Sequence, residues 1–358
     1  MQSNNDKLLE LYKPQSLKTI TTAQQLHAGR FSPCGKFFVA GGMEGDVRRW
    51  RLADEEPQEL DRLDGHDGWV QGLTFDQKGE LLFTADSWGQ LRAWENWKDT
   101  PKVKWQVKDA HNGWIRELAV NPNGKLIASC GLDQRVCLWS TDTGTKQAEL
   151  ANYGQDIFSV LFHGDGKSFV SGDGHGIVKQ WDVDKRECVR EFDASALYLY
   201  HRIQNVGGVR TLAFDREGKT LAVGGTKPKN GGNVQGVPTV LLFDWASGKL
   251  KHTLEFGATT HCYVHDVHLH DAGFVIAVTS GTPGTGQLIF QQPDAKEAFY
   301  LDTKLTNLHS LSVHEASRRI AVTGTNRGSN GNGRRLNKEG EYIGNNSPIY
   351  VFHLGPSE

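Results

Sequence analysis

Three histidines occupy equivalent places in the sequence and could bind a metal ion together. His27, His265 and His309 each follow the first residue of a short apolar segment. Neutral imidazoles that converge in this way could hold a transition metal. Partly protonated, and joined by Arg116 and Arg210, they could instead attract an anion. The ordinary alternative is that these histidines hydrogen-bond to water and to polar neighbours, and on that view the protein has no metal site.

Other patterns that resemble chemical motifs are incomplete. The run from His261 to His270 is rich in histidine but lacks the glutamate of an HExxH zinc motif, and we expect it to be a strand. The glycine-rich stretch Gly281–Gly286 leads into a strand and not into a helix, so it is expected to be a hairpin turn and not a phosphate-binding loop. Neither a GxSxG elbow nor a CxxC pair occurs. We therefore expect no catalytic residue and no cofactor.

The composition favours a chain of short strands. Of its 358 residues, 37% are hydrophobic and 23% charged, with 41 glycines and two methionines. A formal net charge of −2 supplies no general positive field for nucleic-acid binding. The five cysteines form no pattern, no secretory signal is visible, and no apolar run is long enough to cross a bilayer. We therefore expect a cytoplasmic protein that binds neither nucleic acid nor membrane.

A strand–turn–strand pattern recurs seven times along the chain. In six repeats the turn between the first two strands ends in glycine, which supplies the positive φ that such turns commonly need. The first strands begin at Leu26, Val70, Ile115, Ile157, Val209, Val264 and Leu308. The third strands end at Trp50, Trp94, Trp139, Trp181, Phe243, Phe290 and Phe352. Self-similarity of this period indicates a repeat architecture.

Parts of this repeat resemble the WD40-repeat family. The resemblance rests on Gly65-His66, on the run from Cys130 to Trp139 and on Trp181-Asp182. It implies a circular propeller with four antiparallel strands in each blade. Residues 20–192 match the pattern well, and the last three repeats match it loosely. We therefore expect an all-β fold: one divergent seven-bladed β-propeller that spans residues 1–358.

The resemblance also implies a polar brace inside each blade. In that family an Asp, a His, a Ser or Thr and the Trp are hydrogen-bonded to one another. The second repeat keeps His66 and Trp94 but has Trp88 where the aspartate is expected. Only the third repeat keeps all four residues, which are His111, Ser129, Asp133 and Trp139. Most blades should therefore depend on apolar packing more than on the brace.

Closure of the ring requires one more strand. The last repeat stops after its third strand, Ile349–Phe352, and without an outer strand its blade would have an unpaired edge. The segment Leu8–Tyr12 has alternating residues and precedes the first blade. We expect it to pair there as the missing fourth strand of the last blade.

One face of the ring should carry the functional surface. Four insertions, at 193–208, 226–238, 280–287 and 325–348, all fall in connections that leave from the same end of a propeller. Loops are favoured sites of binding, although mere surface decoration would look the same. Aromatic residues and arginines near the channel mouth on this face resemble binding hot spots, although the tryptophans could simply cover neighbouring blades. The candidate partner-binding residues are Trp69, Trp88, Trp114, Arg116, Phe158, Arg210 and Tyr263.

Two classes of function follow from these observations. The first is a non-catalytic, monomeric scaffold that binds another protein or a peptide on the loop-rich face. The alternative is a small-ligand or metal-binding propeller enzyme whose site at the channel mouth is formed by His27, His265 and His309. An exposed aromatic patch would favour the scaffold, and an enclosed pocket with bound metal would favour the enzyme.

Overall fold

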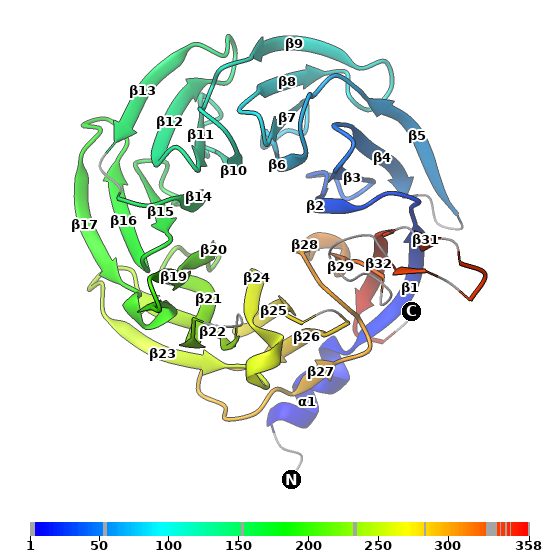
Figure 1. Cartoon of the computed structure of the whole chain (residues 1–358), viewed down its shortest axis with the longest axis vertical. Coiled ribbons are helices and arrows are strands. Elements are labelled where there is room, and N and C mark those ends of the chain that lie inside the picture. The colour runs from blue at the N-terminus through cyan, green and yellow to red at the C-terminus, as the bar shows by residue number, and fades with distance from the viewer. Residues whose placement is uncertain are drawn as a thin grey trace.

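Seven antiparallel sheets of four strands each stand around a central axis, so the protein is a seven-bladed β-propeller, as expected (Figure 1). The first strand of each blade lies nearest the centre of the ring, and the fourth strand lies at the rim. The computed structural model describes residues 4–52, 56–151, 154–231, 235–282, 284–326, 335–336, 338–340, 342–343 and 345–356.

The first four blades follow one another along the chain with short connections. Blade 1 consists of β2 (Leu26–Phe31), β3 (Phe37–Gly42), β4 (Val47–Leu52) and β5 (Pro57–Leu63). Blade 2 consists of β6 (Val70–Phe75), β7 (Leu81–Asp86), β8 (Leu91–Glu95) and β9 (Lys102–Val107). Blade 3 consists of β10 (Ile115–Val120), β11 (Leu126–Gly131), β12 (Arg135–Ser140) and β13 (Lys146–Ala151). Blade 4 consists of β14 (Ile157–Phe162), β15 (Ser168–Asp173), β16 (Ile177–Asp182) and β17 (Cys188–Asp193).

The last three blades carry the insertions. Blade 5 consists of β20 (Val209–Phe214), β21 (Thr220–Asn230), β22 (Gln235–Asp244) and β23 (Leu250–Glu255). Blade 6 consists of β24 (Tyr263–His270), β25 (Phe274–Ser280), β26 (Gly286–Gln291) and β27 (Tyr300–Asp302). Blade 7 consists of β28 (Ser310–His314), β29 (Arg319–Thr323), β32 (Pro348–Leu354) and β1 (Pro14–Thr21).

Two short hairpins and a few helices complete the described part of the chain. The hairpin of β18 (Tyr198–His201) and β19 (Gln204–Gly207) lies between blades 4 and 5. The pair β30 (Arg335–Leu336) and β31 (Tyr342–Ile343) belongs to the insertion of blade 7, much of which lies outside the described residues. The helices are α1 (Asn4–Tyr12) and 3₁₀ turns at Ser195–Leu197, Thr259–His261 and Glu315–Ser317. None of these helices is long and apolar enough to span a membrane.

The strand that closes the ring is not the one expected. Residues 8–12 belong to the helix α1, and β1, which follows them, pairs antiparallel with β32 from Pro14 opposite Leu354 onward. Leu8 and Tyr12 lie four residues apart, so they share one helix face, and both pack on the apolar cluster of blades 6 and 7. Closure by an N-terminal strand is therefore confirmed, but its assignment to residues 8–12 was wrong.

Burial explains why the strands of one blade differ in composition. The second strands are buried along almost their whole length, because each blade is covered by a neighbour on both faces. The fourth strands lie at the rim and expose most of their residues, several of which are charged. The turn before each second strand has positive φ, as at Gly79 (φ 64°), and in blade 7 Arg318 (φ 49°) adopts it without a glycine.

Apolar clusters join each blade to the next around the whole ring. In each of the first four blades, the tryptophan of the third strand is buried in the cluster shared with the preceding blade. At the closing boundary, Phe38 and Trp50 of blade 1 pack with Ile349 and Val351 of blade 7. The residue type that marks the repeat in the sequence is therefore one that holds neighbouring blades together.

Candidate binding site at the channel mouth

A β-bulge interrupts the pairing of the first and second strands at the same place in six blades. In each case the extra residue follows the first-strand start expected from the sequence. A bulge sets two residues of one strand against one of the other and re-aims the extra side chain. The bulged residues are His27, Gln71, Arg116, Phe158, Arg210 and His265. One repeated irregularity of the backbone thus positions Arg116, Phe158 and Arg210 of the candidate site.

Arginines and aromatic rings alternate across blades 3 to 6. The Arg116 guanidinium lies 4.2 Å from the ring centroid of Trp114 and 5.2 Å from that of Phe158. The Arg210 guanidinium lies 4.0 Å from the centroid of Phe158 and 4.9 Å from that of Tyr263. Phe158 is therefore sandwiched between two cations, each of which also contacts a second ring. Such cation–π contacts favour one fixed position for each guanidinium.

Aromatic contacts continue the series on both sides. Trp69 meets Trp114 edge to face at 5.3 Å and stacks on His27 at 5.5 Å. Trp69 of blade 2 thus contacts a ring of blade 1 and a ring of blade 3. On the other side, Tyr263 contacts His265, and His265 contacts His309 at 5.7 Å. Every blade thus contributes at least one ring or guanidinium group to a continuous series of contacts. Gln71 is outside this series of rings and accepts a hydrogen bond from Arg116 (3.4 Å).

The three histidines at the mouth bind hydroxyl groups or rings. His265 Nε2 lies 2.7 Å from Ser280 Oγ, and His309 Nε2 lies 2.6 Å from Thr325 Oγ1. Burial lowers the pKa of His27 and His309 to about 4 and that of His265 to about 3. Each imidazole is therefore neutral near pH 7, which excludes the expectation that they attract an anion as partly protonated groups.

The metal hypothesis finds no support in this geometry. Within the described part of the chain, no group of three His, Cys, Asp or Glu side chains is placed to hold a metal ion. The enzyme alternative depended on His27, His265 and His309 as such a group. The histidine-rich strand β24 likewise directs His268 and His270 to one carboxylate, that of Glu315, at 2.9 and 3.1 Å.

The two mouth arginines are half-buried cations. Burial, followed by the charge of Arg210, lowers the pKa of Arg116 to about 10, and burial also lowers that of Arg210. A guanidinium is not deprotonated in proteins, so both side chains carry a positive charge. The Nε atom of each is buried without a hydrogen-bond partner among the described residues, and neither guanidinium lies within 4 Å of a described carboxylate. Asp156 is the carboxylate that acts on both guanidinium groups, so the mouth presents more positive than negative charge.

A cavity of about 360 Å³ opens beside Arg210. Phe158, Arg210 and Tyr263 form its inner wall, and the β18–β19 hairpin contributes Gln204 and Asn205. The insertion between blades 4 and 5 thus builds one wall of the cavity. The loop-rich face is thus hollowed beside Arg210.

Charged side chains from three blades meet inside the channel and line a second cavity of about 440 Å³. Arg30 lies between two carboxylates from other blades, 3.7 Å from Glu117 and 3.2 Å from Asp266. Ser159 Oγ donates to Glu117 (2.7 Å), and Thr211 Oγ1 donates to Asp266 (3.4 Å). The sequence offered a signal for this layer that was missed: charged residues inside short apolar first strands.

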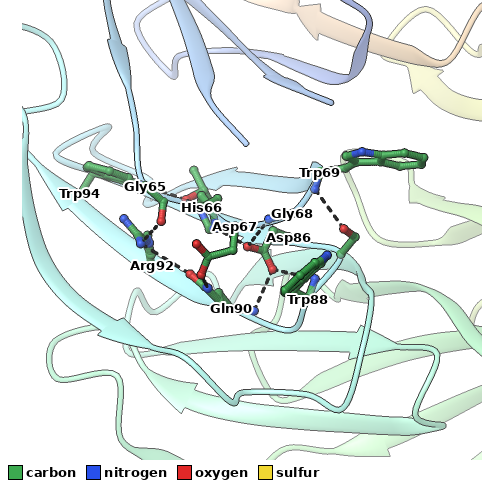
Figure 2. A network of polar contacts seen from close by, with 12 residues as sticks. Gly65, His66, Asp67, Gly68, Trp69, Asp86, Trp88, Gln90, Arg92 and Trp94 are labelled. Atoms are coloured by element: carbon green, nitrogen blue, oxygen red, sulfur yellow. Dashed lines mark hydrogen bonds and ion pairs between the residues drawn. The ribbon is translucent and has the colours of Figure 1, made fainter. Parts of the chain in front are cut away.

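The brace of the second blade is complete, contrary to expectation (Figure 2). His66 Nδ1 lies 3.0 Å from Asp86 Oδ2, and His66 Nε2 lies 2.6 Å from Thr84 Oγ1. Trp94 Nε1 donates to the same Thr84 oxygen (2.9 Å). Asp86 stands two residues before the expected position and reaches the histidine from there, so Trp88 does not break the brace. Thr84 could have been found in the sequence, because it lies ten residues before Trp94, as Ser129 lies before Trp139.

The third blade has the brace that the resemblance implied. His111 Nδ1 lies 2.8 Å from Asp133 Oδ1, and His111 Nε2 lies 2.7 Å from Ser129 Oγ. Trp139 Nε1 donates to Ser129 Oγ (2.8 Å). The two braces lie side by side in neighbouring blades and fix the loops that carry Trp69 and Trp114.

Released from the brace, Trp88 lies on the surface. Its side chain is 70% exposed, and that of Trp69 is 38% exposed. Asp86 Oδ1 accepts hydrogen bonds from the backbone N–H groups of Trp88 and Gln90, both at 2.9 Å, so the turn is held from within (Figure 2). Gly68 lies against the indole of Trp88, since a Cβ there would come within 2.5 Å of Trp88 Cδ1. The exposed indole of Trp88 is thus attached to an ordered backbone turn.

Comparison with known proteins matches the repeat to a family. The family described as WD domain, G-beta repeat matches residues 57–95, 104–140 and 144–182. Each matched segment runs from the fourth strand of one blade through the third strand of the next. The sequence repeat is therefore offset by one strand from the blade, which interlocks neighbouring blades.

A curated relative extends the comparison. WD repeat-containing protein 55 of Arabidopsis thaliana is 32% identical to this chain over 73 residues, which is 20% of this chain and 21% of that protein. The match thus spans about a fifth of the relative's length. By its architecture the chain is a repeat propeller with interlocked blades. Three of its repeats match the WD40-repeat family, and propellers of such repeats generally mediate protein–protein interaction.

Proposed function

We propose that the protein is a non-catalytic scaffold that binds a partner protein on the face that carries the channel mouth. The partner contacts the exposed tryptophans first and extends over the mouth. The residues of this docking face are Trp69, Trp88, Trp114, Arg116, Phe158, Arg210 and Tyr263.

The exposure of Trp88 on a rigid turn carries this proposal. A large aromatic ring that is 70% exposed leaves apolar surface in water that a partner would cover. Burial of that surface would contribute roughly 3–4 kcal/mol before the entropic costs of association. Asp86 already fixes the turn through two backbone hydrogen bonds, so little order has to be created on binding. Tryptophan in such a setting is typical of binding hot spots.

Affinity capture with matched variants tests the docking face. Wild type, Trp69→Ala/Trp88→Ala and Val189→Ala/Leu250→Ala are immobilised and exposed to the same lysate, and the retained proteins are identified by mass spectrometry. Val189 and Leu250 are also exposed apolar residues, but they lie on fourth strands at the rim. A protein retained by the wild type is then purified and its dissociation constant is measured by calorimetry.

The expected result is specific to the tryptophans. The partner should bind the rim variant as it binds the wild type, and should bind the tryptophan variant at least 30-fold more weakly, about 2 kcal/mol. All three proteins should have similar melting curves. Equal binding by the tryptophan variant, or loss of binding in the rim variant alone, would move the docking surface to another face.

A further inference from the structure

The rings at the channel mouth are already occupied by the protein's own cations. Arg116 lies over Trp114 and Phe158, and Arg210 lies over Phe158 and Tyr263, at 4.0 to 5.2 Å. A ring face that holds a guanidinium has no room for a second cation. The mouth therefore cannot serve as an aromatic cage for a cationic side chain, although its residue types would suit one.

The net charge that faces a ligand here is positive. His27, His265 and His309 are neutral near pH 7 and leave the two arginines as the cations of this layer. Asp156, which lines the same cavity, is the carboxylate that acts on both arginines, and it lies more than 4 Å from either. One carboxylate does not balance two guanidinium groups that also repel each other.

Two buried hydrogen-bond donors indicate that the site lacks an acceptor. The Nε atoms of Arg116 and Arg210 are buried and have no hydrogen-bond partner among the described residues. A buried cationic donor without an acceptor is costly, so such atoms in a native site call for a ligand, an ion or water. The cavity beside Arg210 adds the side-chain amides of Gln155, Gln204 and Asn205, which can donate to an anion.

The layer of charged side chains inside the channel does not offer a second site for an anion. Arg30 lies 3.7 Å from Glu117 and 3.2 Å from Asp266, so the cation of that layer is already paired. That layer therefore does not attract a negative group, whereas the mouth does.

We propose that the channel mouth is a receptor for one anionic side chain of the docked partner, a carboxylate or a phosphate, held by Arg210 in the cavity beside Phe158 and attracted by the charge of Arg116 at the same ring. The proposal rests on the docking face described above and names what the partner must present. A charge-assisted hydrogen bond from Arg210, together with the neighbouring charge of Arg116, gives this contact its strength.

Titration with small anions tests the site without any partner. Sodium phosphate and sodium acetate are titrated at constant ionic strength into protein labelled with ¹⁵N, and the indole N–H signals are followed by NMR. Trp114 contacts Arg116, so its signal reports on the site. Saturable shifts with a dissociation constant on the order of millimolar are expected. Saturation by phosphate alone indicates a phosphorylated side chain, and saturation by both anions shows that a carboxylate suffices.

Matched arginine variants make the test specific. Arg210→Gln and Arg116→Gln should each weaken anion binding at least tenfold. Arg190→Gln should leave it unchanged, although Arg190 also stacks on two rings, those of Phe192 and Trp245. A melting curve shows whether each mouth variant is folded. If one of them does not fold, the other alone tests the proposal. Shifts that never saturate, or equal binding by wild type and folded mouth variants, would overturn the proposal.

The two proposals can fail separately. Phosphate or acetate binding that depends on Arg210, together with a partner insensitive to Trp69 and Trp88, would refute the docking face only. A partner that requires both tryptophans but binds Arg210→Gln as it binds the wild type would refute the anion receptor only. Phosphatase treatment of the partner then assigns the anion: loss of binding indicates a phosphate, and retention indicates a carboxylate.

Discussion

Glu117 should make the protein less stable as the pH rises through the neutral range. Its side chain lies in the channel, where burial raises its pKa to about 7, against an ordinary value of 4.5. Arg30 and the Ser159 hydroxyl favour the charged form, and Asp266 opposes it, but burial dominates. The folded protein therefore holds the proton of Glu117 at pH values where the unfolded chain has already released it.

The sign and the size follow from this difference. Between pH 4.5 and 7 the native state binds more protons than the unfolded state, so its stability falls as the pH rises, and it levels off above pH 7. At 1.36 kcal/mol per pKa unit, the full effect is about 3 kcal/mol. Glu117→Gln mimics the protonated side chain and still offers an oxygen to Ser159. The variant should match the wild type near pH 4 and exceed it by about 3 kcal/mol at pH 8.

Urea denaturation followed by tryptophan fluorescence, repeated from pH 4.5 to pH 8.5, measures this difference. The control is Glu80→Gln, in which an exposed carboxylate in a turn of blade 2 is changed in the same way. The control should follow the wild type at every pH. If the wild type is instead more stable than Glu117→Gln above pH 7, Arg30 holds Glu117 in its ionised form. The reasoning from burial would then be wrong.

Two further predictions concern the brace and the ring closure. Thr84→Val should destabilise the protein by about 2–4 kcal/mol, because His66 and Trp94 lose their shared hydrogen-bond partner in a buried site. Urea denaturation measures this loss of stability, and Thr253→Val, at an exposed position, is the control. A cost no greater than that of the control would mean that the brace is dispensable. Removal of residues 1–12 should lower the melting temperature modestly, since α1 buries no residue completely, whereas removal of residues 1–21 also takes β1 away and should abolish the cooperative transition. Similar melting curves for the two truncations, recorded by circular dichroism, would contradict this account of closure.

The repeat made the architecture predictable from the sequence alone. Apolar first-strand starts and third-strand aromatics mark packing positions between blades, and such positions impose their residue types directly. The sequence predicted that an N-terminal strand closes the ring, but it did not predict which residues form that strand. Leu8–Tyr12 satisfies both a strand pattern and a helix pattern over its short length, and only packing on the cluster of blades 6 and 7 decides between them.

The candidate site was less accessible to sequence reasoning. Arg116, Phe158 and Arg210 were identified as neighbours of the first-strand starts, but the bulge that makes their side chains meet is a property of strand pairing. Spacing along the chain also does not show that Ser280 and Thr325 lie within hydrogen-bond distance of His265 and His309. The brace of blade 2 was missed because Asp86 reaches His66 from an unexpected position along the turn.

β1 cannot pair with β32 until nearly the whole chain has been synthesised. Roughly 330 residues separate the two strands, and ribosomes add about 5–20 residues per second, so β1 waits on the order of tens of seconds for its partner. During that time its hydrogen-bonding edge is open to other nascent chains. Lys18 and the polar residues around it keep this waiting strand charged and poorly suited to aggregation. Substitutions that make β1 more apolar would thus reduce the yield of folded protein in the cell, even where they stabilise the finished ring.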